Sequence, residues 1–243
     1  MTPKQPRNER VAAIVLAAGA ASRFGPANET PKQFLDLGGE PVVVRSVRAM
    51  LGCEAVRTAV CAVAAAWREH AGRLLEKAGL ASRITLVEGG ATRQASAQHA
   101  LAALAGPEAP AVVLIHDAAR PLVPPDAVHA ALLAARDHGA AVVAGPAVDT
   151  TAVSDAGFLT TVLERSALVC IQTPQAFRYD VICEAHRHAA EEGVTDATDD
   201  ATLVLRLGHQ VAVVPGPVTN IKITSAADLE FARLLLGRQA TSA

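Results

Sequence analysis

The feature that most constrains the fold is a short apolar segment that runs directly into a loop of very small residues. Val11–Leu16 is apolar enough for a buried strand, and Ala17–Ser22 follows it with alanine, glycine and serine. Small side chains let backbone N–H groups approach a polyphosphate closely. Arg23 and the triplet Pro31–Gln33 come next, and Arg23 and Lys32 supply positive charge. The segment predicts a strand–loop site for a nucleoside triphosphate.

Two better-known phosphate sites do not fit this segment. A dinucleotide fingerprint requires three spaced glycines, but after Gly19 the chain has Ala21 and Phe24 at the next two positions. A Walker A loop requires Gly-Lys followed by serine or threonine, which the sequence does not contain. A dehydrogenase and a P-loop enzyme are therefore disfavoured.

The rest of the chain alternates short β-rich runs with helical stretches, which predicts an α/β fold with a mainly parallel sheet covered on both faces. The expected strands are Val11–Leu16, Arg57–Val63, Arg83–Val87, Ala111–Ile115 and Ala140–Ala144, and the expected helices are Val42–Leu51, Ala66–Lys77, Arg93–Leu104 and Asp126–His138. Further elements are expected as a strand at Val169–Gln172, helices at Tyr179–Glu192 and Asp199–Leu207, a strand at Gln210–Val214 and a helix at Ala226–Leu235.

One segment interrupts this alternation after Gly145. Residues 147–165 contain a turn-like stretch, Ser154–Gly157, between two extended segments, which predicts a hairpin or arm. The sequence has no internal repeat and no low-complexity linker. We therefore expect a single domain over residues 1–243, with an arm at about 147–165.

Composition excludes several other classes of protein. The chain has 22 basic and 24 acidic residues in 243, and it has no basic stripe with interleaved aromatics, so no nucleic-acid partner is expected. The four cysteines are far apart, which disfavours a zinc site and fits reduced thiols. The polar start of the chain does not resemble a signal peptide, and no apolar run is suited to a membrane span. The expected location is the cytoplasm.

Six further motifs follow the N-terminal segment in a fixed order. They are Gly89-Gly90, His116–Pro121 (HDAARP), Asp149-Thr150, Gln172–Gln175 (QTPQ), Thr198–Asp200 and Asn220–Lys222 (NIK). With these motifs the chain resembles the 2-C-methyl-D-erythritol 4-phosphate cytidylyltransferases of the non-mevalonate isoprenoid pathway, from Val11 to about Leu236. The resemblance implies transfer of CMP from CTP to methylerythritol phosphate, with Mg²⁺ as cofactor. It also implies a Rossmann-like fold and a homodimer joined through the projecting β-arm.

The resemblance also implies a role for each matching residue. Arg23, Lys32 and Lys222 would be catalytic; Ala17, Ala18, Gly19, Gly90, Ser96 and Ala118 would bind the nucleotide; Arg120, Thr150, Arg165, Thr173 and Thr198 would bind the second substrate; and Asp117 would bind the metal. Thr150 and Arg165 lie on the arm and would act in the active site of the second subunit. Ala91 departs from an acidic residue found in some members, and Ala152 departs from a lysine found in many.

Several interpretations of single residues stay open. Asp117 follows an apolar strand, where open α/β sheets bind ligands, although an aspartate can also cap the next turn. His116 is expected to have no acid–base role, because the attacking phosphate is already deprotonated. Arg93 is either functional or a solvated arginine at a helix start. Thr198 could bind substrate, cap a helix, or do both.

Three alternative functions share part of this pattern. A pentitol-phosphate cytidylyltransferase shares the nucleotide loop, so only the residues on the sugar-phosphate side separate the two. A molybdenum-cofactor nucleotidyltransferase shares the N-terminal loop but lacks QTPQ and NIK in this arrangement. A catalytically silent nucleotide-binding protein is disfavoured because the charged set Arg23, Lys32, Asp117 and Lys222 is complete.

Overall fold

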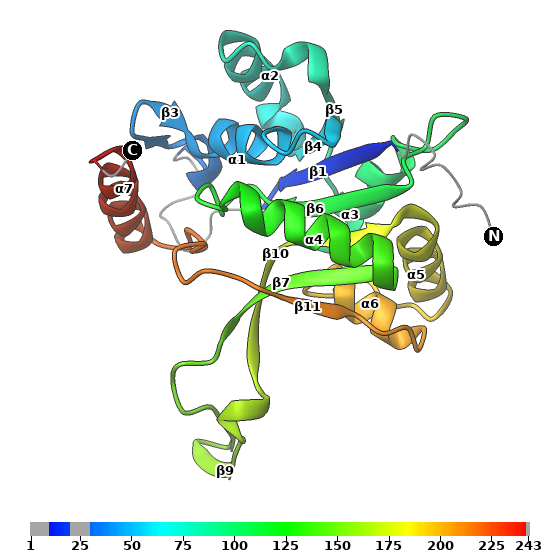
Figure 1. The fold of residues 1–243 in the computed structure, drawn as a ribbon, viewed down its shortest axis with the longest axis vertical. Helices are drawn as coiled ribbons and strands as arrows, with labels where there is room; N and C mark the ends of the chain where they lie inside the picture. The colour runs from blue at the N-terminus through cyan, green and yellow to red at the C-terminus, as the bar shows by residue number, and fades with distance from the viewer. Residues whose placement is uncertain (1–9, 20–29, 242–243) are drawn as a thin grey trace, which may run out of the picture.

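A seven-stranded sheet forms the centre of the molecule (Figure 1). The computed structural model describes residues 10–19 and 30–241, so the predicted role of Arg23 lies outside the described residues. In order across the sheet, the strands are β11 (Ala212–Pro215), β7 (Ala140–Pro146), β10 (Val169–Arg178), β6 (Val112–Asp117), β1 (Val11–Ala17), β4 (Val56–Val63) and β5 (Ile84–Glu88). All strands except β10 run in one direction. The expected mainly parallel sheet is confirmed.

Helices cover both faces of the sheet. They are α1 (Val42–Leu51), α2 (Arg68–Lys77), α3 (Arg93–Ala102), α4 (Pro125–His138), α5 (Tyr179–Glu191) and α6 (Asp200–Arg206), whereas α7 (Ala226–Thr241) packs in a separate cluster with Leu37, Leu122 and Ile223. Successive strand side chains point to opposite faces, so Val15 packs in the core formed with α1, α2 and α4, and Ile14 packs in the core formed with α3, α5 and α6. Because both faces are covered, the central strand β1 is apolar along its whole length.

The register of the central strands decides where polar residues can gather. β1 lies between β4 and β6 and pairs with both in parallel, with Leu16 opposite Asp117. The small-residue loop after β1 therefore leaves the sheet beside the carboxylate at the end of β6. This edge is where ligands bind in open α/β sheets.

Strand β10 differs most from the sequence-based expectation. The expected strand ended at Gln172, whereas the observed strand continues to Arg178 and lies antiparallel between β6 and β7. Pro174 in the QTPQ motif is a residue that usually ends a strand. Here it lies where the register with β7 shifts, between Ile171 and Gln175, a position at which a missing N–H is tolerated.

An arm projects from the body of the protein between β7 and β10 (Figure 1). It carries the hairpin of β8 (Ala152–Asp155) and β9 (Phe158–Val162), as the turn-like sequence predicted. Its apolar side chains are exposed, with Phe158 at 78% and Leu159 at 74%. No helix among the described residues combines the length and the apolarity needed to cross a bilayer.

Candidate active site

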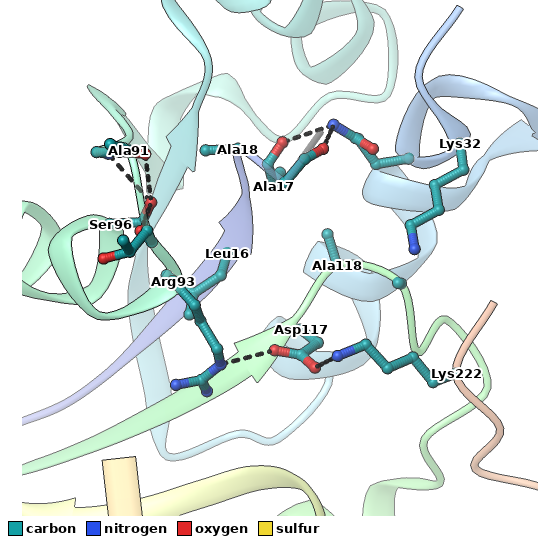
Figure 2. A pocket seen from close by; sticks show the side chains of 15 residues that line it. Leu16, Ala17, Ala18, Lys32, Ala91, Arg93, Ser96, Asp117, Ala118 and Lys222 are labelled. Carbon is teal, nitrogen blue, oxygen red and sulfur yellow. Dashed lines mark hydrogen bonds and ion pairs between the residues drawn. The ribbon is translucent and has the colours of Figure 1, made fainter. Parts of the chain in front are cut away.

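A cavity of about 420 Å³ opens at the carboxyl ends of β1 and β6 (Figure 2). It is lined by Leu16, Ala17, Ala18, Gly19, Lys32, Gln33, Gly90, Ala91, Thr92, Arg93, Ser96, Asp117, Ala118, Ala119 and Lys222. The described members of the predicted catalytic, nucleotide and metal sets are therefore together in one place. The predicted substrate residues Arg120, Thr150, Arg165, Thr173 and Thr198 do not line this cavity.

One wall of the cavity is shaped by glycines that allow very close packing. A Cβ atom on Gly89 would collide with Ala18, and a Cβ on Gly90 would collide with Ala95 of α3. The Ser96 hydroxyl accepts the N–H of Gly90 at 3.1 Å and donates to the carbonyl of Thr92 at 2.9 Å. The Gly-Gly motif is thus fixed against α3 and faces the small-residue loop.

A short 3-10 helix, η1 (Lys32–Phe34), contributes Lys32 and Gln33 to the opposite wall. The side chain of Lys32 extends toward the cavity in Figure 2. The buried Gln33 amide donates to the carbonyls of Ala17 at 2.8 Å and Gly19 at 3.4 Å, which joins η1 to the loop after β1. Phe34 stacks on Trp67 with ring centroids 5.1 Å apart. The sequence marked this triplet as a unit, but the positioning role of Gln33 was not predicted.

Asp117 lies between two cationic side chains at the floor of the cavity. Its Oδ2 is 2.7 Å from Nζ of Lys222, and its Oδ1 is 3.4 Å from Nε of Arg93 (Figure 2). Burial acts to raise the pKa of this carboxyl, but the charges of Arg93 and Lys222 outweigh it and hold the pKa well below its usual range. Asp117 is therefore ionised.

Lys222 reaches the cavity because the next residue, Ile223, is bonded to the loop after β6. The N–H of Ile223 donates to the carbonyl of Ala119 at 2.8 Å, and the Ile223 side chain is buried beside Leu229 of α7. Segments far apart in the chain are joined in this way. Lys222, expected to be catalytic together with Lys32, thus lines the same cavity as Lys32.

A polar network under Asp117 accounts for His116 and Thr173. His116 is fully buried, and burial lowers its pKa to about 4. Its Nε2 lies 3.0 Å from the carbonyl of Arg120 and must donate to it, so Nδ1 accepts the hydroxyl of Thr173 at 2.9 Å. The Thr173 oxygen in turn accepts the N–H of Asp117 at 3.1 Å. This neutral imidazole has a structural environment, in line with the expectation of no acid–base role.

The predicted substrate residues lie outside the cavity, with Thr173 in the network under Asp117 and the other four in three places. Arg120 is half-buried, and its Nη1 donates to the carbonyl of Asn220 at 2.7 Å. Thr198 is exposed just before α6, whose N-cap is Asp199, with its carboxylate accepting the N–H of Thr202. The remaining two, Thr150 and Arg165, are exposed at the base of the arm. Their contacts with a substrate stay predictions.

Arg93 is the clearest functional candidate that the sequence left undecided. It is not a solvated helix-start arginine, because its side chain is only 20% exposed and pairs with Asp117 and Asp200. The buried His186 bonds Asp200 as well. Asp200 is 107 residues from Arg93 in the chain, so no local pattern indicated the pair.

The donors present suit a hard cation shared with a ligand better than a closed metal site. No cluster of three or more histidine, cysteine, aspartate or glutamate residues suited to a metal occurs in the described part of the chain. Asp117 is the only carboxylate among the described lining residues. Mg²⁺ commonly binds through one or two carboxylates together with substrate phosphates and water. A single carboxylate in a cavity with room for phosphates matches that mode.

Comparison with known proteins identifies the family. A family model described as IspD, 2-C-methyl-D-erythritol 4-phosphate cytidylyltransferase, matches residues 11–238. The chain belongs to this family. The resemblance recognised from the motifs is thereby confirmed, and the chain is placed among the nucleotidyltransferases of isoprenoid biosynthesis.

Individual members of the family match along almost the full length. The 2-C-methyl-D-erythritol 4-phosphate cytidylyltransferase of Pelotomaculum thermopropionicum is 44% identical over 231 residues, which is 94% of either chain. The crystal structure of the protein of the same name from Thermus thermophilus aligns with a TM-score of 0.75 at 34% identity, over 93% of this chain and 98% of that one. A 4-diphosphocytidyl-2C-methyl-D-erythritol synthase from Anaerococcus prevotii aligns with a TM-score of 0.82 at 25% identity, over 95% and 100%. Fold and family agree.

Proposed function

We propose that this protein transfers CMP from CTP to 2-C-methyl-D-erythritol 4-phosphate and releases pyrophosphate. The observation that carries the proposal is that one cavity gathers Lys32, Lys222 and an ionised Asp117 beside a loop of small residues. Membership of the cytidylyltransferase family gives the substrates. The set is suited to a polyphosphate, because it combines backbone access with concentrated positive charge.

The reaction needs positioning and charge neutralisation rather than a covalent nucleophile. A phosphate oxygen of the acceptor attacks the α-phosphorus of CTP, a new P–O bond forms, and the bond to the pyrophosphate leaving group breaks. Lys32 and Lys222 stabilise negative charge around the phosphorus during this step, and Arg23 is proposed to join them. No proton has to be removed from the acceptor, so the neutral and buried His116 fits a structural role.

We propose Asp117 as the protein ligand of a Mg²⁺ ion shared with the triphosphate. The ion would supply Lewis-acid polarisation of the phosphoryl oxygens. Lys222 and Arg93 keep the Asp117 carboxylate ionised, although burial opposes this. We also propose that the backbone at Ala17, Ala18, Gly19 and Ala118 faces the phosphates, whereas Gly90 and Ser96 face the base.

We propose that the acceptor site is completed by a second copy of the chain. Thr150 and Arg165 do not line the cavity of their own chain, and the arm that carries them exposes apolar side chains such as Phe158 and Val162. Exposed apolar surface of this kind is typical of an interface. In a homodimer, Thr150 and Arg165 of one protomer would join Arg120, Thr173 and Thr198 of its partner. On this proposal residues 1–243 act as one cytoplasmic domain with an arm at about 147–165.

The proposal is tested by pyrophosphate release with CTP and Mg²⁺ and two alternative acceptors. Turnover with methylerythritol 4-phosphate, and little with ribitol 5-phosphate, is the expected result. Preference for ribitol 5-phosphate would keep the mechanism and replace the acceptor. No turnover with either acceptor, from a folded protein that binds CTP, would contradict the proposal.

A further inference from the structure

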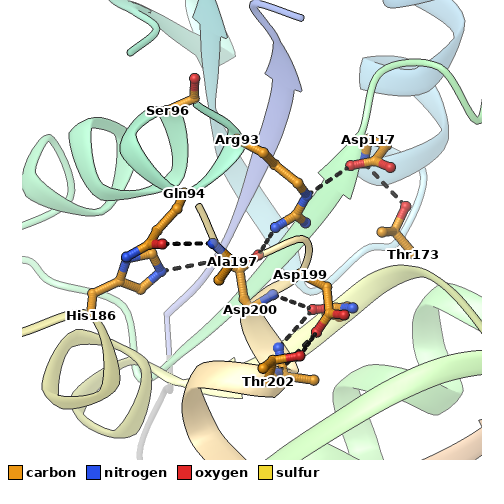
Figure 3. Close-up of polar contacts among 12 residues, drawn as sticks. Arg93, Gln94, Ser96, Asp117, Thr173, His186, Ala197, Asp199, Asp200 and Thr202 are labelled. Carbon is orange, nitrogen blue, oxygen red and sulfur yellow. Dashed lines mark hydrogen bonds and ion pairs between the residues drawn. The ribbon is translucent and has the colours of Figure 1, made fainter. Parts of the chain in front are cut away.

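Arg93 lies between two carboxylates, and its stronger bond is to the one that does not line the cavity. Its Nη1 is 2.6 Å from Oδ2 of Asp200, whereas its Nε is 3.4 Å from Oδ1 of Asp117 (Figure 3). The first distance is that of a strong charge-assisted hydrogen bond, and the second is at the outer limit of one. The guanidinium is thus turned toward Asp200 and makes only a long contact with Asp117, the carboxylate of the cavity.

Asp200 is itself fixed in place on every side. Its side chain is 1% exposed, and its second oxygen, Oδ1, lies 3.0 Å from Nε2 of His186 on α5. The side-chain oxygen of Gln175 on β10 accepts the N–H of Asp200 at 3.0 Å and that of Ala201 at 3.1 Å. The carboxylate therefore cannot follow Arg93 if Arg93 moves toward the cavity.

The start of α3 is joined to the segment before α6 by three further hydrogen bonds. The Gln94 amide donates to the carbonyl of Val194 at 2.7 Å, and its oxygen accepts the N–H of Ala197 at 2.9 Å (Figure 3). The hydroxyl of Thr92 donates to the carbonyl of Thr195 at 3.0 Å. These contacts fix the spacing between the two helices, so the geometry of the Arg93–Asp200 pair is set before any ligand binds.

A guanidinium this close to Asp117 would compete with a divalent cation for the same carboxylate. An unrestrained arginine prefers a forked, two-bond pairing with a carboxylate. Arg93 instead divides its contacts, and the stronger bond goes to Asp200. Asp117 Oδ1 is left with a long contact only, while its Oδ2 pairs with Lys222.

We propose that Asp200 is a positioning residue that restrains Arg93 and so keeps Asp117 open to a divalent cation. The inference rests on the proposed function for its ligands, Mg²⁺ and CTP, and adds Arg93, Asp200 and the supporting His186 to the residues that govern the site. The proposal predicts the direction in which each substitution changes cation binding. Removal of the Asp200 charge lets Arg93 pair more strongly with Asp117 and weakens cation binding, whereas removal of Arg93 does not weaken it.

The test is a double-mutant cycle read by Mn²⁺ binding, measured from the electron paramagnetic resonance of free Mn²⁺ at saturating CTP. Asp200→Asn should raise the Kd for Mn²⁺ by about tenfold or more, the usual effect of losing an outer partner of a metal ligand. Arg93→Gln should bind Mn²⁺ at least as tightly as the unmodified protein. The double variant should bind like Arg93→Gln alone, because without the guanidinium Asp200 has nothing to restrain.

Asp199→Asn is the matched control. It removes the same charge one residue away, and asparagine retains the capping bond to Thr202, so Mn²⁺ binding should not change. An equal loss from Asp200→Asn in both backgrounds would show a purely structural role and overturn the proposal, as would no loss in either. If Asp200→Asn does not fold, Arg93→Gln alone decides, since a tenfold weakening of Mn²⁺ binding there would refute the restraint. Absence of turnover with methylerythritol 4-phosphate would reject only the proposed function, because the cycle needs no acceptor.

Discussion

Lys222→Ala tests the electrostatic core of the proposed mechanism. The change removes a positive charge 2.7 Å from Oδ2 of Asp117 without altering the backbone of the site. Two unit charges about 4 Å apart interact by about 4 kcal/mol at the effective dielectric constant of a protein surface. The Lys222 side chain is 42% exposed, so solvent screening reduces this value. We take about 3 kcal/mol as the loss of transition-state stabilisation.

A loss of this size corresponds to a fall of about 10²-fold in kcat, within the range measured when one preorganised donor is removed from an active site. The assay is steady-state pyrophosphate release with CTP, methylerythritol 4-phosphate and Mg²⁺. An interaction made mainly in the transition state lowers kcat and kcat/KM together, whereas uniform binding raises KM alone. We expect the first pattern.

Lys77→Ala is the control, because Lys77 is an exposed lysine at the end of α2 and does not line the cavity. Circular dichroism should show that both variants are folded. A kcat for Lys222→Ala within about threefold of the unmodified protein would remove Lys222 from the catalytic set. So would an increase in KM with no change in kcat.

Three further predictions concern packing, assembly and pH. Gly90→Ala should lower the free energy of unfolding by about 1–3 kcal/mol in urea titrations, because the added Cβ would collide with α3. An unchanged stability would show that α3 can shift to accommodate the methyl group. Phe158→Asp should shift sedimentation toward monomer, and mixed dimers of Arg165→Ala with Lys222→Ala should regain activity, whereas mixtures that stay inactive would contradict an arm acting in the partner's site. Because the pKa of Asp117 is lowered in the folded state, the stabilisation that this carboxylate contributes is complete above about pH 4 and is lost as the pH falls further. Asp117→Asn should therefore reduce the loss of folding stability that acid causes. An unchanged dependence of stability on acid pH would show that Asp117 does not cause that loss.

The sequence predicted those parts of the site that are local in the chain. The apolar run before the small-residue loop, and the apolar strand before Asp117, are patterns that a parallel sheet covered on both faces requires. Parallel pairing then brings the two strand ends together, which the register of Leu16 with Asp117 confirms. The same argument predicted the arm, because turn residues between extended segments define a hairpin without distant partners.

Features that depend on distant residues were not predictable in this way. The expected strand ended at Gln172, and the shifted register beside Pro174 explains how β10 continues through the proline. Arg93 had two equal interpretations, because its partner Asp200 is far away in the chain. His186 gave no signal at all, since one histidine on a helix is usually packed in the core, and its partner is known only from the fold.

The stacking of Phe34 on Trp67 has a practical consequence. Trp67 is the only tryptophan in the chain, and its ring lies against the residue that ends the segment carrying Lys32. Intrinsic fluorescence excited at long wavelength therefore comes from one position, next to one wall of the cavity. The chain carries its own optical reporter of the Lys32 segment, and a titration with nucleotide can be followed there without any added label.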